Sequence, residues 1–466
     1  MAAYLPEKSS TKLEMKRWAD AVLLWAEVAV SSLIHTLFGF SLLSSALASE
    51  ISKTLRGILK PSSPAMAESQ GVGDGRPPVV MIHGMFGFGE GKMGGLSYFG
   101  GVEKRDERVL VPDLGSLTSI HDRARRLFYY LKGGRVDYGE EHSKAAGHSQ
   151  FGTVYEHGHY PEWDEEHPLQ FVTHSAGSQV VRVLQQMLAD KAFEGYENTS
   201  EDWVLSLTCI SGPLNGTTRA YMDGVGAGDW RCVKPVCMVQ VCRLAICIYD
   251  WLDIGWMKRF YNFGFDHFEL SWRKVGVWGL VECLMGHAGP TATGDWVLPD
   301  LTLQGTAATN ARTATFPNTF YFSYASRKTR RISGVTVPCM PPGMHPALLL
   351  RSWQMCRWRH PEEAEPPYKG YRDEDWEEND GAVNTFSMTH PRIPREHPSC
   401  EVSDDGYWER ETVKAGMWYY RVVEADHMMF VVNRERAGVE FDLLYDAIFE
   451  RCRKLGQGKK TRSAVQ

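Results

Sequence analysis

The sequence of 466 residues contains ten cysteines but no Cys-x-x-Cys pair, which argues against a zinc site built from cysteines. Ten cysteines in a chain of this length do not make a disulfide scaffold, and they do not decide between a reducing and an oxidising compartment. The formal net charge of −6 gives no reason to expect a nucleic-acid partner. No internal repeat is apparent, which excludes a repeat architecture.

The composition is that of a globular, loop-rich protein, with 43% hydrophobic residues, 44 glycines and 15 tryptophans. The length allows one large domain with insertions or two domains. Short apolar stretches alternate with helical patterns, which predicts an α/β fold with a mostly parallel, doubly wound sheet. The predicted strands lie at about 77–84, 109–111, 171–173, 204–210, 319–324 and 419–423, with helices at 123–131 and 179–188. We predict one domain over 77–453, with insertions at about 117–160 and 218–300.

The N-terminus differs from the rest of the chain. Within an apolar stretch from Ala21 to Ala48, the segment from residue 28 onward carries no Asp, Glu, Lys or Arg and is about as long as a helix that crosses a bilayer. We therefore predict an apolar helix in residues 1–60 that anchors the protein to a membrane, either an endomembrane or a lipid surface. A cleaved signal, with secretion, and a soluble packed helix are the alternatives. Residues 61–76 are typical of a linker and residues 454–466 of a flexible tail.

Residues 169–183 carry the strongest chemical signal. An apolar strand runs into Ser175, Ala176 and Gly177, and a helical apolar pattern follows. A serine at a sharp strand-to-helix turn is typical of the nucleophile elbow of α/β-hydrolases. Such a turn exposes the serine Oγ, and the helix N-terminus behind it favours developing negative charge. Thr173 stands where the usual pattern has glycine, so a plain strand–helix turn is the alternative.

A serine nucleophile needs a histidine base and an acid that fixes the tautomer of that histidine. In the α/β-hydrolase fold the acid and then the histidine follow the serine, on loops after later strands. His427 comes directly after the predicted strand 419–423, whereas His390 and His397 lie in proline-rich loops. Asp380 lies in a loop-forming Glu-Asn-Asp-Gly run and is our candidate for the acid. Its rivals are Asp375, Asp404 and Asp405.

An oxyanion hole needs two backbone N–H groups, one from the residue after the serine and one from the loop after the first strand. These positions predict Ala176 and Met85. Two histidines, His83 and His174, flank the site. We expect both to pack and to hydrogen-bond the turns and not to react.

The first insertion is rich in aspartate and histidine. Asp122, His142 and His148 are suitable zinc ligands with open positions between them. Histidines are abundant in this stretch, however, and the residues alone favour a solvated polar insertion.

Several longer motifs, taken in order, resemble those of the zinc-containing thermoalkalophilic bacterial lipases and their plant relatives, over roughly residues 77–440. The motifs are HGMFGFG at 83–89, YFGGV at 98–102, GGRVDYG at 133–139, NGTT at 215–218, PNT at 317–319 and ENDGAVNT at 378–385. The resemblance implies a lipolytic α/β-hydrolase whose triad falls on Ser175, Asp380 and His427. It also implies a structural zinc site, which ties the two insertions together and falls on Asp122, His142, His148 and Asp295.

The chain departs from this family in two places. The residue after the nucleophile is typically glutamine in the family and is Ala176 here, a change that backbone donation survives. The family's calcium site uses acidic residues shortly after the catalytic histidine, where this chain has Met429 and Asn433-Arg434. A hard cation prefers oxygen ligands, so we predict that the calcium site is absent.

The second insertion carries a dense apolar stretch at 235–260, which charged residues interrupt. This pattern, together with the resemblance, predicts amphipathic helices that cover the site as a mobile lid. Ordinary cap helices that face the core are the alternative.

These inferences predict a serine hydrolase that cleaves the carboxylic esters of acylglycerols through an acyl-enzyme. Phospholipase A1 or galactolipase activity is one alternative, and a catalytically inactive lipid-binding or scaffold protein is another. The expected partners are a lipid substrate and a membrane or lipid-droplet surface, with no nucleic acid. The sequence leaves the lipid class and the oligomeric state open.

Overall fold

The computed structural model describes residue 22 and residues 77–463, except 107, 342, 403–412 and 433–436. The predicted N-terminal helix, apart from Val22, and the linker at 61–76 therefore lie outside the described residues. The rival acids Asp404 and Asp405, and Asn433-Arg434 at the position of the predicted absent calcium site, also lie outside the described residues.

Seven strands form one sheet in the order β10-β11-β7-β6-β5-β1-β2, and every neighbouring pair is parallel. This arrangement confirms the predicted mostly parallel sheet. The strands are β1 (Val79–Ile82), β2 (Val109–Leu110), β5 (Leu169–His174), β6 (Val204–Ile210), β7 (Phe320–Ser326), β10 (Ser399–Glu401) and β11 (Trp418–Val423).

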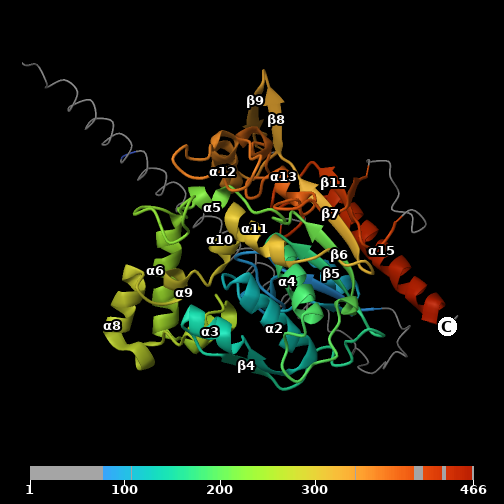
Figure 1. The fold of residues 1–466 in the computed structure, drawn as a ribbon, viewed down its shortest axis with the longest axis horizontal. Coiled ribbons are helices and arrows are strands. Elements are labelled where there is room, and N and C mark those ends of the chain that lie inside the picture. The colour runs from blue at the N-terminus through green and yellow to red at the C-terminus, as the bar shows by residue number, and fades with distance from the viewer. Residues whose placement is uncertain are drawn as a thin grey trace, which may run out of the picture.

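Helices cover both faces of this sheet, because successive side chains of a strand point to opposite sides. Val80 and Ile82 of β1 belong to the core that also holds α2 (Ile120–Lys132) and α4 (Gly177–Ala189). Val79 and Met81 face the other core, which α15 (Val439–Ser463) closes. Figure 1 shows α2 and α4 side by side in front of the sheet.

The chain order in the sheet reverses at β1, which lies between β2 and β5. In an open parallel sheet, such a switch point leaves a crevice at the carboxyl ends of the strands, where ligands bind. Ile82 at the end of β1 lies opposite Thr173 near the end of β5. The segments that follow these two strands therefore begin next to each other.

Two segments depart from the regular alternation of strand and helix. The first forms an antiparallel ribbon of β3 (Gly134–Asp137) and β4 (Phe151–Tyr155), with α3 (Glu140–Ala146) between the two strands. The second lies between β6 and β7, and its outer helices project to one side of the molecule in Figure 1. We call this second segment the cap. Its helices are α5 (Arg219–Met222), α6 (Met238–Leu252), α7 (Gly255–Phe260), α8 (Trp272–Met285), α9 (Pro290–Thr293), α10 (Val297–Asp300) and α11 (Leu303–Arg312).

The cap carries a disulfide, Cys247–Cys283, which joins α6 to α8. A further excursion follows β7 and contains the hairpin of β8 (Thr329–Ile332) and β9 (Val335–Pro338), then α12 (Pro346–Arg357) and α13 (Thr385–Met388).

The C-terminal helix α15 continues to Ser463, beyond residue 454 where the sequence predicts a flexible tail. Cys452 and Leu455 on this helix are both buried, and burial of such side chains favours continued helix. None of the helices in the described residues is long and apolar enough to cross a membrane.

Candidate active site

Ser175 lies on a strained turn between β5 and α4. Its φ of 55° is in the left-handed region that residues other than glycine rarely adopt, and such strain is typical of functional turns. A Cβ on Gly177 would lie 2.6 Å from the carbonyl oxygen of Ile82, so this position needs glycine. Thr173 fits because its hydroxyl lies 2.9 Å from Ser178 Oγ and donates to the Thr208 carbonyl at 3.2 Å.

The structure brings Ser175 together with Asp380 and His427. His427 Nε2 lies 3.0 Å from Ser175 Oγ, and His427 Nδ1 lies 2.8 Å from Asp380 Oδ2. All three side chains are buried. An Nδ1–H that donates to Asp380 leaves the Nε2 lone pair facing the serine hydroxyl, which is the tautomer a general base needs.

Asp380 is held by the backbone of its own loop. Its Oδ1 accepts from the amides of Ala382 at 2.9 Å and Val383 at 2.8 Å, so only Oδ2 is available to the histidine. The rival acid Asp375 is paired with Arg372 at 2.5 Å. The two other histidines of this part of the chain are also engaged elsewhere, His390 with Glu396 and His397 with Thr315.

The loop after β1 lies directly on the serine. A Cβ on Gly84 would come within 2.7 Å of Ser175 Cβ and 3.2 Å of Ser175 Oγ. Within the described part of the chain, the amides of Met85 and Ala176 have no hydrogen-bond acceptor. Ala176 is the N-cap residue of the 13-residue helix α4, whose positive end faces this place. The two amides at which we predicted an oxyanion hole are therefore free to donate.

His83 and His174 are buried on either side of the serine, as expected for residues that support turns. Burial, with a smaller contribution from the charge of Arg123, lowers the pKa of His83 to about 3. Burial, followed by the neighbouring His427, holds the pKa of His174 well below its usual range. Both rings are neutral at physiological pH, so each offers one N–H and one acceptor nitrogen.

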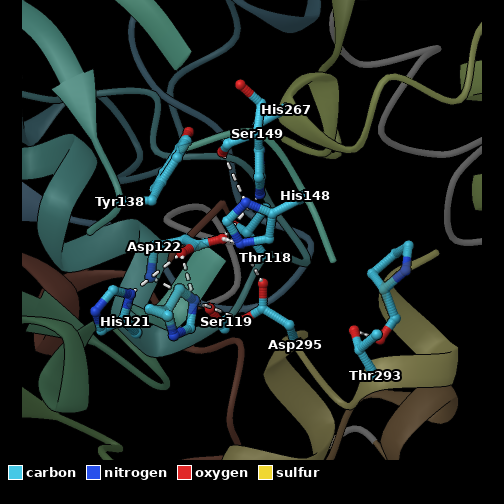
Figure 2. A network of polar contacts seen from close by, with 12 residues as sticks. Thr118, Ser119, His121, Asp122, Tyr138, His148, Ser149, His267, Thr293 and Asp295 are labelled. Carbon is cyan, nitrogen blue, oxygen red and sulfur yellow. Dashed lines mark hydrogen bonds and ion pairs between the residues drawn. The ribbon is translucent and has the colours of Figure 1, made fainter. Parts of the chain in front are cut away.

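A second polar cluster lies between the first insertion and the cap. Figure 2 shows Asp122, His148 and Asp295 turned toward one another, and His142 joins them. His142 Nε2 lies 3.1 Å from Asp122 Oδ1 and 3.4 Å from Asp295 Oδ1, and His148 Nε2 lies 3.2 Å from Asp295 Oδ2. The four residues that the resemblance implies as zinc ligands thus meet in space.

Within the described residues, Asp122, His148, Asp295 and His267 form one group of side chains that could hold a metal ion, and Asp122 and His142 form a second with His121. Four ligands at zinc's usual bond length of about 2.0–2.1 Å stand about 3.3–3.4 Å apart along the edges of a tetrahedron. Three of the contacts, at 3.1, 3.4 and 3.2 Å, are close to this separation, and the contact between His148 Nε2 and Asp122 Oδ2 is longer at 3.9 Å. Within the described residues, His142 Nε2, His148 Nε2 and Asp295 Oδ2 are buried and make no hydrogen bond, so a cation would satisfy all three atoms.

His267 also belongs to this cluster, although no sequence pattern indicated it. Its Nε2 lies 2.8 Å from Asp122 Oδ2, and its ring packs against Tyr138 at 4.3 Å between ring centroids. His121 is a second addition, because its ring stacks on that of His142 at 3.7 Å. His267 belongs to the cap and is far from Asp122 in the sequence, so no local spacing signalled the contact.

The cap contacts the loop after β1. The hydroxyl of Tyr261, just after α7, donates to the carbonyl of Phe86 at 3.1 Å, and Lys92 Nζ donates to the carbonyl of Lys258 at 3.2 Å. The outer helices of the cap expose three tryptophans, Trp256, Trp272 and Trp278, by 65%, 51% and 79%. The cap thus joins an exposed apolar surface to a loop that borders Ser175.

Comparison with known proteins points to lipases. Residues 75–227 match the family described as "Lipase-like, C-terminal domain". The chain is 28% identical to a lipase of Staphylococcus hyicus over 84% of its own length and 59% of the relative, and 26% identical to lipase 2 of Staphylococcus aureus over 80% and 53%. The chain therefore spans little more than half the length of the curated relatives it matches.

Solved structures show the same fold. The crystal structure of Staphylococcus hyicus lipase matches with a TM-score of 0.66 at 23% identity, covering 85% of this chain and all of that one. The structure of EstA from Clostridium botulinum matches with a TM-score of 0.61 at 25% identity, covering 80% and 87%. With the parallel sheet and its flanking helices, these likenesses show an α/β-hydrolase-like fold, as predicted.

The predicted membrane-associated location is wrong. The relatives are staphylococcal lipases, which agrees with the alternative of secretion and not with association with a membrane.

Proposed function

We propose that the protein is a serine hydrolase of the lipase type, which cleaves the carboxylic ester bonds of acylglycerols through an acyl-enzyme. The observation that carries this proposal is the placement of Ser175. It stands on a turn with a φ of 55°, with His427 Nε2 at 3.0 Å from its Oγ and Asp380 behind the histidine. The similarity to lipases selects lipid esters among the possible acyl substrates.

In the proposed mechanism, Ser175 Oγ attacks the acyl carbonyl carbon while His427 takes the hydroxyl proton at Nε2. Asp380 stabilises the imidazolium that forms. The amides of Met85 and Ala176 donate to the oxyanion, whose charge is stabilised where water is excluded. His427 then gives the proton to the leaving alcohol, and a water activated by the same histidine releases the fatty acid.

For the polar cluster, we propose a structural zinc ion held by Asp122, His142, His148 and Asp295. Zinc would supply a cross-link between α2, the segment around α3 and the segment that precedes α10, and so fix the cap to the first insertion. The side chain of His267 supports this role, since a hydrogen bond at 2.8 Å orients Asp122. We also propose that the chain is related to the zinc-containing thermoalkalophilic bacterial lipases and their plant relatives.

We further propose that the cap acts as a lid over the site and that it opens when the enzyme meets an aggregated lipid substrate. The exposed tryptophans of α7 and α8 support this proposal, because amphipathic aromatic side chains favour lipid–water boundaries. Phospholipase A1 or galactolipase activity is the alternative within the same chemistry.

The test is a lipid panel assayed with the full chain and two variants, Ser175→Ala and Ser211→Ala. Ser211 is a matched control, because it is buried directly after the neighbouring strand β6 and its hydroxyl lies 2.7 Å from Ser326 Oγ. We expect fatty-acid release from triacylglycerol emulsions, with loss in Ser175→Ala by about 10³-fold or more and little change in Ser211→Ala.

Faster release from phosphatidylcholine or galactolipid would move the proposal to the alternative substrates. Full activity in Ser175→Ala, or no release from any lipid by the unmodified chain, would overturn it.

A further inference from the structure

The hydroxyl of Tyr98 links the two loops that lie on either side of Ser175. The amide of Gly84 donates to Tyr98 Oη at 3.3 Å, and Tyr98 Oη lies 2.8 Å from His174 Nδ1. On the far side of that ring, His174 Nε2 lies 2.9 Å from the backbone carbonyl oxygen of His427. One connected path of hydrogen bonds thus runs from the loop after β1 to the loop after β11.

The direction of every bond in this path is fixed by chemistry. The carbonyl oxygen of His427 can only accept, so His174 Nε2 carries the proton and donates. A neutral ring then has an acceptor at Nδ1, which Tyr98 can fill only by donating its O–H. The oxygen of Tyr98 retains a lone pair, and this accepts the N–H of Gly84.

The local environment holds these protonation states. Burial, followed by the effect of His427, lowers the pKa of His174, so the ring stays neutral. Burial likewise raises the pKa of Tyr98, so its hydroxyl keeps its proton. Both side chains are at most 6% exposed, and bulk water therefore does not compete for these bonds.

Hydrogen bonds hold the peptide unit between His83 and Gly84 at both ends. Its N–H points to Tyr98, and its carbonyl oxygen accepts from Arg123 Nη2 at 2.5 Å. The next residue is Met85, whose amide is the proposed oxyanion donor. Rotation of the peptide unit between His83 and Gly84 would turn the Met85 amide away from the place where the oxyanion forms.

We propose that Tyr98 and His174 are positioning residues that set the Met85 amide and the imidazole of His427 relative to each other. The inference rests on the proposed function, since it assigns to these residues the alignment of the nucleophile's two partners. Neither side chain takes part in proton transfer, because His174 is already bonded at both ring nitrogens. They fix the distance between the oxyanion site and the base. Catalysis is sensitive to changes of about 1 Å in such a distance.

The first experiment compares Tyr98→Phe with the unmodified enzyme and with Tyr321→Phe on a soluble short-chain ester. Tyr98→Phe keeps the ring and its edge contacts with Phe88 and Phe99 but removes the hydroxyl. Tyr321 is a matched control, because it is also buried and its hydroxyl donates to Gln185 at 2.9 Å. It lies on β7, three residues before Tyr324, where the pairing of β6 with β7 ends.

Active sites are first counted by titration with a chromogenic phosphonate ester, which reacts with the serine, so that unfolded protein does not affect the rates. Per titrated site, we expect Tyr98→Phe to lower kcat by about tenfold to a hundredfold with KM within about twofold, as for misplaced catalytic groups. Tyr321→Phe should retain kcat.

The second experiment compares two replacements of His174 whose amide nitrogens reach the positions of different ring nitrogens. The amide nitrogen of glutamine can replace Nε2–H, whereas asparagine reaches only as far as Nδ1. His174→Gln should therefore retain the bond to the His427 carbonyl and keep several times more kcat per titrated site than His174→Asn.

Unchanged kcat per titrated site in Tyr98→Phe would overturn the inference, as would equal losses in His174→Gln and His174→Asn. These outcomes differ from failure of the proposed function, which the activity of Ser175→Ala decides alone.

Discussion

Asp380 holds His427 twice, once through its side chain and once through its backbone. Its Oδ2 lies 2.8 Å from His427 Nδ1, and its carbonyl oxygen accepts the backbone N–H of His427 at 3.0 Å. The imidazole and the loop that carries it are thus fixed by the same residue. A change in the side chain of Asp380 can therefore alter the tautomer of His427 while the loop stays in place.

Replacing Asp380 by asparagine should abolish most activity without unfolding the protein. The amides of Ala382 and Val383 donate to one carboxylate oxygen, so the oxygen of an asparagine would stay there and its NH₂ would face His427. The histidine would then carry its proton on Nε2 and could not accept one from Ser175. We expect kcat on a short-chain ester to fall by about 10³–10⁴-fold. Asp375→Asn is the control, and an equal loss there would contradict the assignment of the acid.

The purified protein should carry about one zinc ion per chain. His148→Gln should remove most of it and lower the melting temperature, because binding to the folded state alone stabilises that state. His159→Gln is the matched control, since this histidine lies in the same insertion but stacks on Tyr130 at 4.0 Å. Elemental analysis and thermal unfolding measure both effects. Less than a tenth of an equivalent of zinc in the unmodified protein would refute the site.

The cap should lose stability as the pH rises from about 4 to 7. Burial raises the pKa of Asp250 on α6 to about 7, and although Lys258 lies 3.8 Å away, neither carboxylate oxygen has a hydrogen bond within the described residues. Folding therefore favours the protonated form, a stabilisation that is present below pH 4 and is lost as the pH passes through 7.

Asp250→Asn cannot ionise and should match the unmodified protein at pH 4 but exceed its unfolding free energy by about 1 kcal/mol or more at pH 8. Lys258 keeps Asp253 and Asp266 as partners at 3.1 Å and 2.8 Å. Asp253→Asn, at a more exposed position, should show no such gain. Parallel stability curves for Asp250→Asn and the unmodified protein would rule out the effect.

The disulfide between Cys247 and Cys283 should stabilise the cap. A cross-link that spans 36 residues restricts the unfolded chain by about 3–4 kcal/mol in the loop-entropy account. The double variant Cys247→Ser with Cys283→Ser should unfold at a lower temperature, whereas Cys242→Ser, a free buried cysteine on the same helix, should change little. Alkylation of Cys247 without prior reduction would show that the bond does not form.

The strands, and the chain order of the proposed triad, could be inferred from the sequence because each signal is local. The turn at Ser175 and the strand before His427 are read from consecutive residues, and parallel strands place their following loops at one edge. The choice of Asp380 over Asp375 was open at the residue level, because it depends on the curvature of a loop. Only the resemblance fixed it, and the geometry now supports it.

Contacts between distant segments could not be predicted. His267 reaches Asp122 from the cap, and Tyr98 reaches His174 from a loop, without any spacing that marks either pair. Asp295 was placed only through the resemblance. The polar composition of residues 454–463 indicates a flexible tail, whereas α15 continues to Ser463. The preceding turns of α15 pack apolar side chains against the sheet, and these contacts cannot be read from the composition of the tail.

The cap lies entirely between two strands that are direct neighbours, since Ser206 of β6 pairs with Phe320 of β7. The ends of the cap are therefore held at a constant separation by the sheet, whatever lies between them. Closing a longer connection costs only about 0.6 kcal/mol for each doubling of its length. Caps of different length could thus be exchanged at this junction, by recombination or by design, to alter which esters reach Ser175 while the catalytic framework is inherited intact.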